Sequence, residues 1–427
     1  MTRRPMIGVG AAVVAVAVAI ALVFALGSPA SPRTAGAPGY PGASGDPGLS
    51  GDPANPGASG DPANPATASS SPRPTVRPVP GYEVFGYVPY WEMNDDIAAH
   101  LARTKLTTLA LFSVTHTKSG KIDTSKTGYQ RITGPIGIQL IREAHDRGVA
   151  VQLVYTSFGS ARNGRFFAST AIQNVTIEGL VALAAKIGAD GINVDIEQLR
   201  ADLVPAYGAF VGRLREALRA ELPDAQVSAA TTAGRTGAAM AMAAVAAGTD
   251  RIFLMGYDYH YAGSEVGASA PVDRRDGAEA DLVWSLDLYE ALGVPVERTI
   301  LGLPLYGMRW RVSGPELGAP RLGDGAIWVP ADNPSFLANP PTPPELDPIE
   351  IVEFYAVAPT VSAEPGDSRA TAGWQAIYVD SAQTLEPKLA LANERGLAGV
   401  GFWAIGYERG LPEYTALIKR FAAGKLE

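Results

Sequence analysis

Two acids and one amide recur at every second position of a single apolar stretch. Residues 191–197 read Gly-Ile-Asn-Val-Asp-Ile-Glu. Successive side chains of a β-strand point to opposite faces, so Asn193, Asp195 and Glu197 would share one face, about 6–7 Å apart. Two carboxylic acids at this spacing suit acid–base chemistry, because their mutual repulsion raises the pKa of one and keeps it protonated. An edge strand with its acids in water is the alternative.

The chain that must position these acids alternates β-branched apolar runs with stretches of helical length after residue 81. Such alternation indicates βαβ units and a parallel sheet, and eight units make a closed barrel. An open doubly wound sheet is the alternative, but no GxGxxG turn follows the first strand. We therefore predict an α/β fold, a (β/α)8 TIM barrel. Its eight strands are expected at Glu83–Val88, Leu106–Thr115, Val149–Tyr155, Gly191–Glu197, Gln226–Thr232, Arg251–Tyr257, Thr299–Leu305 and Gly399–Ala404.

One connection is too long for a simple loop. Residues 308–375 separate the seventh strand from its helix and contain the run Pro340-Pro341-Thr342-Pro343-Pro344. Strand-like pieces also occur there, at 349–357 and 375–379. Since a loop of this length normally holds its own structure or serves function, we predict a small α+β insertion between strand 7 and helix 7.

The first 80 residues differ in composition from the rest. Residues 6–26 form an uninterrupted apolar run behind Arg3 and Arg4, long enough to span a bilayer. We expect residues 1–27 to be a signal peptide or signal-anchor helix, with the anchor favoured, and residues 28–80, rich in Pro, Gly, Ala and Ser, to be a disordered linker. The catalytic part, residues 81–427, would then be extracytoplasmic, membrane-anchored or secreted, and in contact with the membrane only through the N-terminal segment.

Charge and cysteine content exclude several function classes. The chain has no cysteine and four scattered histidines, which excludes disulfides and argues against a zinc site, so we expect no metal and no cofactor. The residues from 81 onward carry 30 basic and 40 acidic side chains, a net charge of −10. An acidic folded part argues against nucleic acid as a partner. We expect a monomer.

Acids and aromatic residues follow several predicted strands. In barrel enzymes the chemistry lies at the carboxyl ends of the strands. Aromatic rings stack on the apolar faces of sugars, and acids bind hydroxyl groups or transfer protons, so this set predicts a carbohydrate site. Capping of the barrel core explains any one aromatic residue equally well, but not the whole set. The residues concerned include Trp91, Asp195, Glu197, Tyr257, Asp258, Tyr306, Arg309 and Trp403.

Three segments together resemble glycoside hydrolase family 18. Residues 190–197, Asp-Gly-Ile-Asn-Val-Asp-Ile-Glu, resemble the family's DxxDxDxE signature, and Met255-Gly256-Tyr257-Asp258 is similar to its sixth-strand motif. Trp403 resembles the tryptophan of its eighth strand. The resemblance covers roughly residues 82–424 and implies a retaining mechanism in which the substrate's own N-acetyl group acts as nucleophile.

The resemblance also implies a role for each site residue. Glu197 would be the general acid and then the base, Asp195 would orient the acetamido group, and Tyr257 would hold the acetamido carbonyl. Trp403 would form the floor of the sugar subsite. The expected substrate-binding residues are Asn193, Asp190, Asp258, Trp403, Tyr87, Trp91, Tyr306 and Arg309.

The sequence departs from the family pattern at two places. Asn193 replaces the second acid of the signature; it can hydrogen-bond Asp195 but cannot carry a proton, and it resembles the branch of spore-cortex and germination glucosaminidases. Residues 157–160, Ser-Phe-Gly-Ser, match the third-strand SxGG motif only loosely. We expect a hydrolase of β-1,4 bonds beside N-acetylglucosamine, with a peptidoglycan substrate ahead of chitin. The alternative is a chitinase-like lectin that binds sugar without cleavage, although Glu197 is present.

Overall fold

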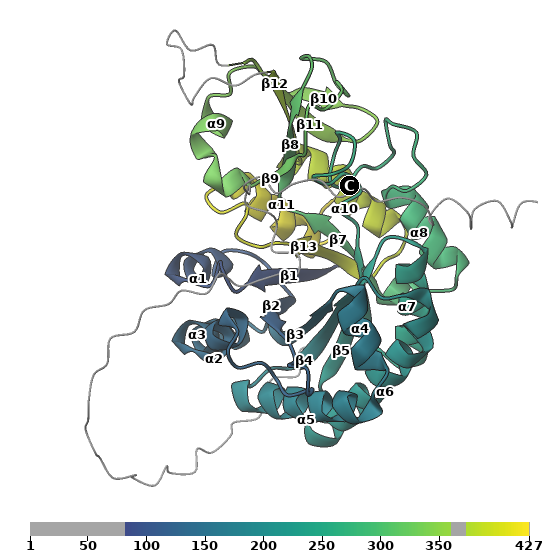
Figure 1. Cartoon of the computed structure of the whole chain (residues 1–427). Helices are drawn as coiled ribbons and strands as arrows, with labels where there is room; N and C mark the ends of the chain where they lie inside the picture. Colours follow the sequence, from purple (N-terminus) through teal and green to yellow (C-terminus); the bar gives the residue numbers. More distant parts are fainter. Residues whose placement is uncertain (1–81, 360–372, 427) are drawn as a thin grey trace, which may run out of the picture. The chain divides into compact units, whose positions relative to one another are not determined.

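Eight parallel strands close into a barrel in the computed structural model, which describes residues 82–359 and 373–426. The expected anchor and linker lie outside the described residues. Neighbouring barrel strands follow the chain order, and β13 closes the barrel between β7 and β1 (Figure 1). The predicted (β/α)8 barrel is therefore confirmed. Its strands are β1 (Glu83–Pro89), β2 (Thr108–Val114), β3 (Ala150–Phe158), β4 (Gly191–Glu197), β5 (Gln226–Thr232), β6 (Arg251–Met255), β7 (Thr299–Pro304) and β13 (Gly399–Trp403).

Helices follow every barrel strand and enclose the barrel (Figure 1). Several begin at a side chain that caps the first turn: Asn94, Ser169, Asp281 and Ser381 each accept a hydrogen bond from a backbone N–H of the helix that follows. In chain order the helices are α1 (Asp95–Leu101), α2 (Thr127–Thr133), α3 (Pro135–Asp146), α4 (Ser160–Phe167), α5 (Thr170–Ile187), α6 (Val204–Glu221), α7 (Arg235–Ala246), α8 (Leu282–Ala291), α10 (Ala382–Glu394) and α11 (Pro412–Ala422).

The strands have two buried faces. On β4, Ile192, Val194 and Ile196 belong to the apolar layer between the barrel and its helices. The alternate positions, Asn193 and Asp195, face the barrel interior and are buried as well. This confirms the predicted separation of apolar and polar faces, and it removes the alternative of an edge strand with its acids in water.

Phe253 on β6 fills part of the barrel interior, and two glycines make room for it. Gly302 on β7 and Gly401 on β13 are register partners across the two strands. A methyl group at either glycine would lie 2.3 Å from a carbon of the Phe253 ring. The ring is fully buried and packs against Phe85 and Tyr87, with ring centroids 5.5 and 4.9 Å apart.

The insertion after β7 forms an antiparallel sheet of five strands and the short helix α9 (Pro334–Ala338). One face of the sheet carries Met308, Trp310 and Phe354, which join the apolar layer of the barrel interior. The opposite face carries its own small cluster around Trp328 and Tyr355. The sheet order is β10 (Glu345–Asp347), β11 (Val352–Val357), β12 (Trp374–Val379), β8 (Gly307–Val312) and β9 (Ala326–Trp328).

One strand boundary was predicted wrongly and one helix was missed, and both differences matter for the site. The sixth strand was expected to reach Tyr257 but ends at Met255, because the Gly256 N–H turns back to bond the carbonyls of Leu254 and Gly302. Tyr257 and Asp258 therefore lie on the loop after β6. The short helix α4 was not predicted at all, and it supplies a residue that holds Glu197.

Within residues 82–359 and 373–426, no single helix is long and apolar enough to cross a bilayer. Helices α4 and α5, bent by 98° at the break between them, satisfy the length and composition criteria as a pair. The apolar run at residues 6–26 lies outside this part of the chain.

The packing around Phe253 generates a test of the barrel interior. A methyl group at Gly401 would also lie 2.9 Å from the carbonyl oxygen of Phe85. We expect Gly401→Ala to lower the free energy of unfolding by about 1–3 kcal/mol, because overpacking forces side chains and backbone to shift. Urea unfolding followed by circular dichroism measures the change.

Gly212→Ala is the matched control. Gly212 lies in α6, where an added methyl group would meet the Cβ of Ala247 at 3.7 Å, an ordinary van der Waals distance. Helix propensity then predicts a gain of about 0.5–1 kcal/mol. A Gly401→Ala protein as stable as the parent would contradict the described packing.

Candidate active site

Asp195 and Glu197 lie at the carboxyl end of β4, on the face that points into the barrel. Asp195 is 4% exposed, and Glu197, at the last position of the strand, is partly exposed at the rim. The chain turns directly after it, at Gln198, whose φ of +57° is uncommon for a residue with a side chain. The two acids are therefore fixed by a strand that ends where the open end of the barrel begins.

The electrostatics of the pair favour a shared proton. Burial, and next the negative charge of Asp258, raise the pKa of Glu197 to about 7. Burial and then the charge of Glu197 raise the pKa of Asp195 well above its usual range. Asp195 Oδ1 has no hydrogen-bond partner within the described residues. Two such carboxyls cannot both ionise cheaply, so near neutral pH the pair holds a proton that it can donate.

Asn193 is held from two sides, and Asp195 is not among its partners. Its Oδ1 accepts a hydrogen bond from the Tyr87 hydroxyl at 2.9 Å, and its Nδ2 donates to Ser228 Oγ at 2.8 Å. Ser228 in turn donates to Gln152 Oε1 at 2.5 Å. The Asn193 amide thus uses its oxygen as an acceptor and its nitrogen as a donor, deeper in the barrel than the acid pair. The expectation that it could bond Asp195 is corrected: the structure connects Asn193 to β1 and β5.

Asn163, on the unpredicted helix α4, fixes the backbone of the acid. Its Nδ2 donates to the carbonyl oxygen of Glu197 at 2.6 Å, and its Oδ1 accepts from Ser157 Oγ at 2.7 Å. Both Asn163 and Ser157 are fully buried. The loosely matching segment 157–160 therefore contributes a support for Glu197. The serine of that segment was the only sequence signal that could have pointed to this contact.

Asp258 extends from the loop after β6 and is held by Tyr306, which follows β7, and by Ser269 of the same loop. The Tyr306 hydroxyl donates to its carboxylate, and its backbone N–H donates to Ser269 Oγ at 3.1 Å. Asp258 itself adopts a φ of +60°. Tyr257, beside it, faces the Tyr306 ring edge-on with centroids 6.4 Å apart. The loop thus brings a third acid, Asp258, close enough to raise the pKa of Glu197.

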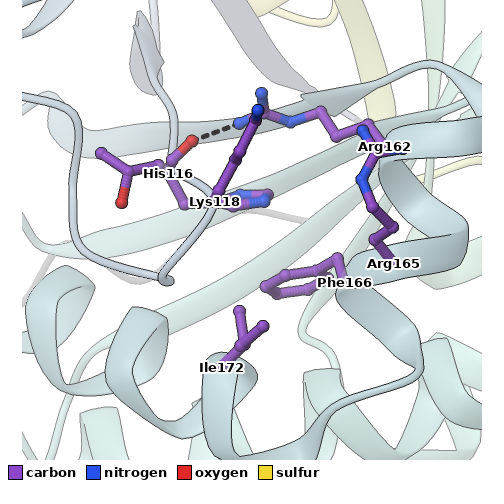
Figure 2. Close-up of a pocket in the computed structure, with 7 residues that line it drawn as sticks. His116, Lys118, Arg162, Arg165, Phe166 and Ile172 are labelled. Carbon is purple, nitrogen blue, oxygen red and sulfur yellow. Dashed lines mark hydrogen bonds between the residues drawn. The ribbon is translucent and has the colours of Figure 1, made fainter.

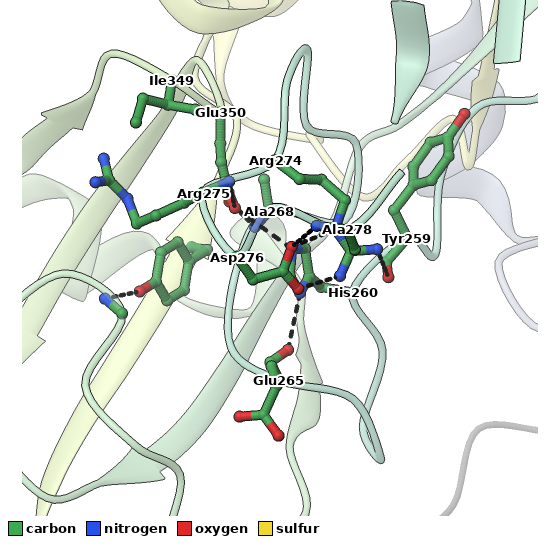
Figure 3. Close-up of polar contacts among 12 residues, drawn as sticks. Tyr259, His260, Glu265, Ala268, Arg274, Arg275, Asp276, Ala278, Ile349 and Glu350 are labelled. Carbon is green, nitrogen blue, oxygen red and sulfur yellow. Dashed lines mark hydrogen bonds and ion pairs between the residues drawn. The ribbon is translucent and has the colours of Figure 1, made fainter. Parts of the chain in front are cut away.

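Polar contacts tie this loop to the insertion (Figure 3). Arg275 forms a bidentate ion pair with the buried Asp347, at 2.8 and 2.5 Å. Glu350 is also buried and accepts from the backbone N–H of Ala268 at 2.6 Å. His260 lies 3.4 Å from the same carboxylate and uses Nδ1 toward the Glu265 carbonyl. The positions of Tyr257 and Asp258 therefore depend on contacts with residues about 90 positions away.

An aromatic floor lies at the same end of the barrel. The Trp403 ring packs against Phe112, Tyr87 and Trp91, with centroids 4.7, 5.6 and 6.3 Å apart. Trp91 is 37% exposed, and its Nε1 donates to the Tyr407 hydroxyl. Tyr87 thus contacts Trp403 from the buried interior of the barrel, and Trp91 contacts it from the exposed rim. Phe112 and Tyr407 are members of the floor that the sequence did not single out.

Two expected substrate-binding residues lie elsewhere. Asp190 precedes β4 at the opposite end of the barrel, roughly 23 Å along the strand from Glu197. Its carboxylate bonds His145 at 2.7 Å and the backbone N–H of Val151 at 2.8 Å. Arg309 is exposed on the face of β8 that points away from the barrel interior, since its neighbours Met308 and Trp310 face inward. Neither residue is brought to the acid pair.

The remaining expected residues gather around the pair: Asn193, Tyr87, Tyr257, Asp258, Tyr306, Trp91 and Trp403. Tyr87 and Tyr306 are nearly fully buried, and their hydroxyls bond Asn193 and Asp258. They therefore position neighbouring polar groups. Across 82–359 and 373–426, His, Asp and Glu side chains form no group of three or more that could hold a metal ion.

Comparisons with known proteins agree with this geometry. The sequence profile described as Glycosyl hydrolases family 18 matches residues 83–408. The chain is 27% identical over 166 residues to Nod factor hydrolase protein 1 of Medicago truncatula, covering 37% of this chain and 39% of that protein. It is 26% identical over 140 residues to the putative sporulation-specific glycosylase YdhD of Bacillus subtilis, covering 31% of each. The chain thus spans less than half the length of either relative.

A solved structure shares the fold. The spore cortex-lytic enzyme SleL of Bacillus cereus superposes with a TM-score of 0.62 and 17% sequence identity, over 80% of this chain and 74% of that one. At this identity the likeness establishes the barrel architecture alone.

The raised pKa of Glu197 predicts how stability depends on pH. A carboxyl whose folded pKa lies above its ordinary value binds its proton more tightly in the folded state. The proton bound to Glu197 therefore stabilises the folded state fully below pH 4.5, and this stabilisation is lost as the pH rises through about 7. We expect Glu197→Gln to make the free energy of unfolding fall less steeply across this window, as measured by urea unfolding at a series of pH values.

Glu216→Gln serves as the control, because it changes the same chemical group at an exposed position of α6. The dependence of the free energy of unfolding on pH should differ from that of the parent in Glu197→Gln and should be unchanged in Glu216→Gln. Equal slopes in all three proteins would mean that the burial of Glu197 does not perturb its proton binding.

Proposed function

The chain belongs to glycosyl hydrolase family 18, and from this premise we propose that it cleaves β-1,4 bonds next to N-acetylglucosamine by substrate-assisted retaining catalysis. The observation that carries the proposal is the acid pair at the end of β4. Glu197 reaches the rim with a pKa raised to about 7, so a large share of it is protonated near neutral pH. A general acid is most effective when its pKa lies near the working pH.

In the first step Glu197 donates its proton to the glycosidic oxygen as the bond between that oxygen and the anomeric carbon breaks. The carbonyl oxygen of the substrate's acetamido group forms a new bond to the anomeric carbon, giving an oxazolinium ion. In the second step water attacks the anomeric carbon while the Glu197 carboxylate takes its proton. The ring opens, the acetamide is regenerated, and the stereochemistry at the anomeric carbon is retained.

Asp195 would stabilise the intermediate through the acetamido N–H. Its Oδ1 is buried and has no partner within the described part of the chain, so an N–H donor would complete it. The negative charge that the two acids carry when they share one proton would also offset the positive charge of the oxazolinium ion. This role needs an acid that does not already serve a neighbour, and Asn193 leaves Asp195 free because it bonds Tyr87 and Ser228 instead.

The aromatic floor and the loop after β6 would hold the sugar. Trp403 lies at the carboxyl end of β13 and would form the floor of the subsite, with Trp91 exposed at the rim beside it. Tyr257 is partly exposed and would hydrogen-bond the acetamido carbonyl, and Asp258 would accept from a sugar hydroxyl. Aromatic faces against apolar sugar faces and acids against hydroxyl groups are the usual means of holding a carbohydrate.

We place the substrate in the cell wall, with peptidoglycan ahead of chitin. The apolar run at residues 6–26 and the Pro- and Gly-rich segment that follows support an exported, anchored or secreted protein acting beside the wall. The relatives named above, a Nod factor hydrolase and a putative sporulation-specific glycosylase, support a glycan substrate in general terms. A monomeric enzyme without a cofactor is consistent with this role.

The test of the activity is release of reducing ends from N-acetylglucosamine oligomers and from peptidoglycan, offered in parallel to the full-length chain. We expect Glu197→Gln to lower the rate about 100- to 10,000-fold, because it removes the general acid with little change in shape. Glu216→Gln should retain the parent rate. Turnover by Glu197→Gln at the parent rate would refute the assignment, and sugar binding without cleavage by the parent would favour the lectin alternative.

A second substitution separates the two acids. Asp195→Asn should lower kcat more than it raises KM, because the proposed contacts strengthen as charge develops in the transition state. Steady-state kinetics with an N-acetylglucosamine tetramer measures both parameters. A variant that changed only KM would show that Asp195 binds the ground state and has no catalytic part.

A further inference from the structure

A pocket of about 230 Å³ opens between the loop after β2 and helix α4. Figure 2 shows its walls: His116 and Lys118 come from the loop, Arg162, Arg165 and Phe166 from the helix, and Ile172 lies at its base on α5. The His116 and Phe166 rings stack at 4.5 Å and close the apolar side. The pocket is separate from the acid pair, and no step of the proposed catalysis uses it.

The pocket is strongly positive in a protein that is otherwise acidic. Three cationic side chains line it, and no acid does. None of Lys118, Arg162 and Arg165 forms an ion pair with another residue of the described segments. Burial and the charge of Arg162 lower the pKa of His116 to about 3, so that ring is neutral at pH 7 and the charge comes from the other three. Unneutralised cations converging on one pocket favour an anionic ligand.

Arg162 is held in place with donors left over. Its guanidinium donates to Thr115 Oγ1 at 2.9 Å and to the carbonyl oxygen of His116, both through Nη2. Its Nε is buried and unpartnered within the described residues. A guanidinium has five N–H groups, and a fixed one loses little entropy when it binds an anion. Exposed Lys118 and Arg165 add mobile charge around this fixed centre.

The pocket lies at the same end of the barrel as Glu197, one strand away. Arg162 directly precedes Asn163, whose side chain holds the Glu197 carbonyl. On the other side, Thr115 Oγ1 donates to the carbonyl of Thr156, and Thr156 is the register partner of Asp195. A glycan strand crossing the acid pair could therefore carry a substituent into the pocket.

We propose that this pocket is an anion subsite that binds a carboxylate carried by the glycan substrate. The inference rests on the proposed function, since it presumes a glycan at Glu197, and it deepens that function by naming an acidic polysaccharide over neutral chitin. In peptidoglycan two carboxylates qualify, the lactyl group of a muramic acid residue without its peptide and the free carboxylates of the stem peptide. Both present the same chemistry to Arg162, Lys118 and Arg165.

Binding to the full-length Glu197→Gln protein, measured by isothermal titration calorimetry, tests the subsite without cleavage of the ligand. The ligands are three tetrasaccharides: the neutral N-acetylglucosamine tetramer, the alternating muramic form with free lactyl carboxylates, and that same form with stem peptides attached. We expect one carboxylated ligand to bind about five- to tenfold more tightly than the neutral one at low salt. Whichever carboxylated ligand binds more tightly shows whether the pocket takes the lactyl or the peptide carboxylate. In 0.5 M NaCl the difference in affinity from the neutral ligand should disappear.

Lys118→Glu combined with Arg165→Glu should abolish the preference, because both residues are exposed and their replacement reverses the charge. Arg162 is left intact, since its bonds support the loop. The matched control is Lys105→Glu, an exposed lysine before β2 at the other end of the barrel, which should keep the preference. Circular dichroism and a melting curve verify that each variant is folded.

Equal affinity for neutral and carboxylated ligands would overturn the proposal, as would an equal loss for all three ligands in the double variant. Failure of all three tetrasaccharides to bind would overturn the proposal too. Failure of the proposed function is distinguishable, because it appears as absence of Glu197-dependent product release by the parent protein.

Discussion

The burial of two carboxyl groups on one strand is the constraint on which the rest of the site depends. Removing a carboxylate from water is costly unless it is paired or protonated, and Asp195 Oδ1 has no partner within the described residues. Proton binding meets this cost, and the surroundings fix the strand from several directions. Asn163 holds the Glu197 carbonyl, and below the acids the Tyr87, Asn193 and Ser228 side chains complete one another. Burial is the main reason that the pKa values of both acids are raised.

The insertion is part of the same construction. Its sheet shares an apolar layer with the barrel interior, and Asp347 and Glu350 bind the loop after β6 from the other side. That loop carries Asp258, whose charge contributes to the raised pKa of Glu197. A segment remote in sequence thus influences the protonation of the acid through a chain of direct contacts. This gives a physical reason why the long connection after β7 is folded against the barrel.

Charge is divided across the open end of the barrel. The acid pair and Asp258 make the centre negative, whereas Lys118, Arg162 and Arg165 make the neighbouring pocket positive. Both share α4, where Arg162 and Asn163 are adjacent and face different sites. One turn of α4 therefore fixes both the backbone of Glu197, through Asn163, and the guanidinium of Arg162. Such a division suits a substrate that combines neutral sugar rings with acidic substituents.

The sequence alone predicted the eight strands, the barrel and the polar face of β4, because the alternation of strand and helix periodicities is a local property of the chain. It also singled out Glu197, Asp195, Tyr257, Asp258 and Trp403, because each lies at or just after the carboxyl end of a recognisable strand. The contacts between segments were decided only by the tertiary structure. Asn193 turns to Tyr87 and Ser228 because β1 and β5 place those hydroxyls beside it, and Asp190 lies at the wrong end because seven residues of strand separate it from Glu197. Arg162 and the bond from Asn163 to the Glu197 carbonyl were not predicted, because α4 is only eight residues long and these partners lie more than 30 residues away along the chain.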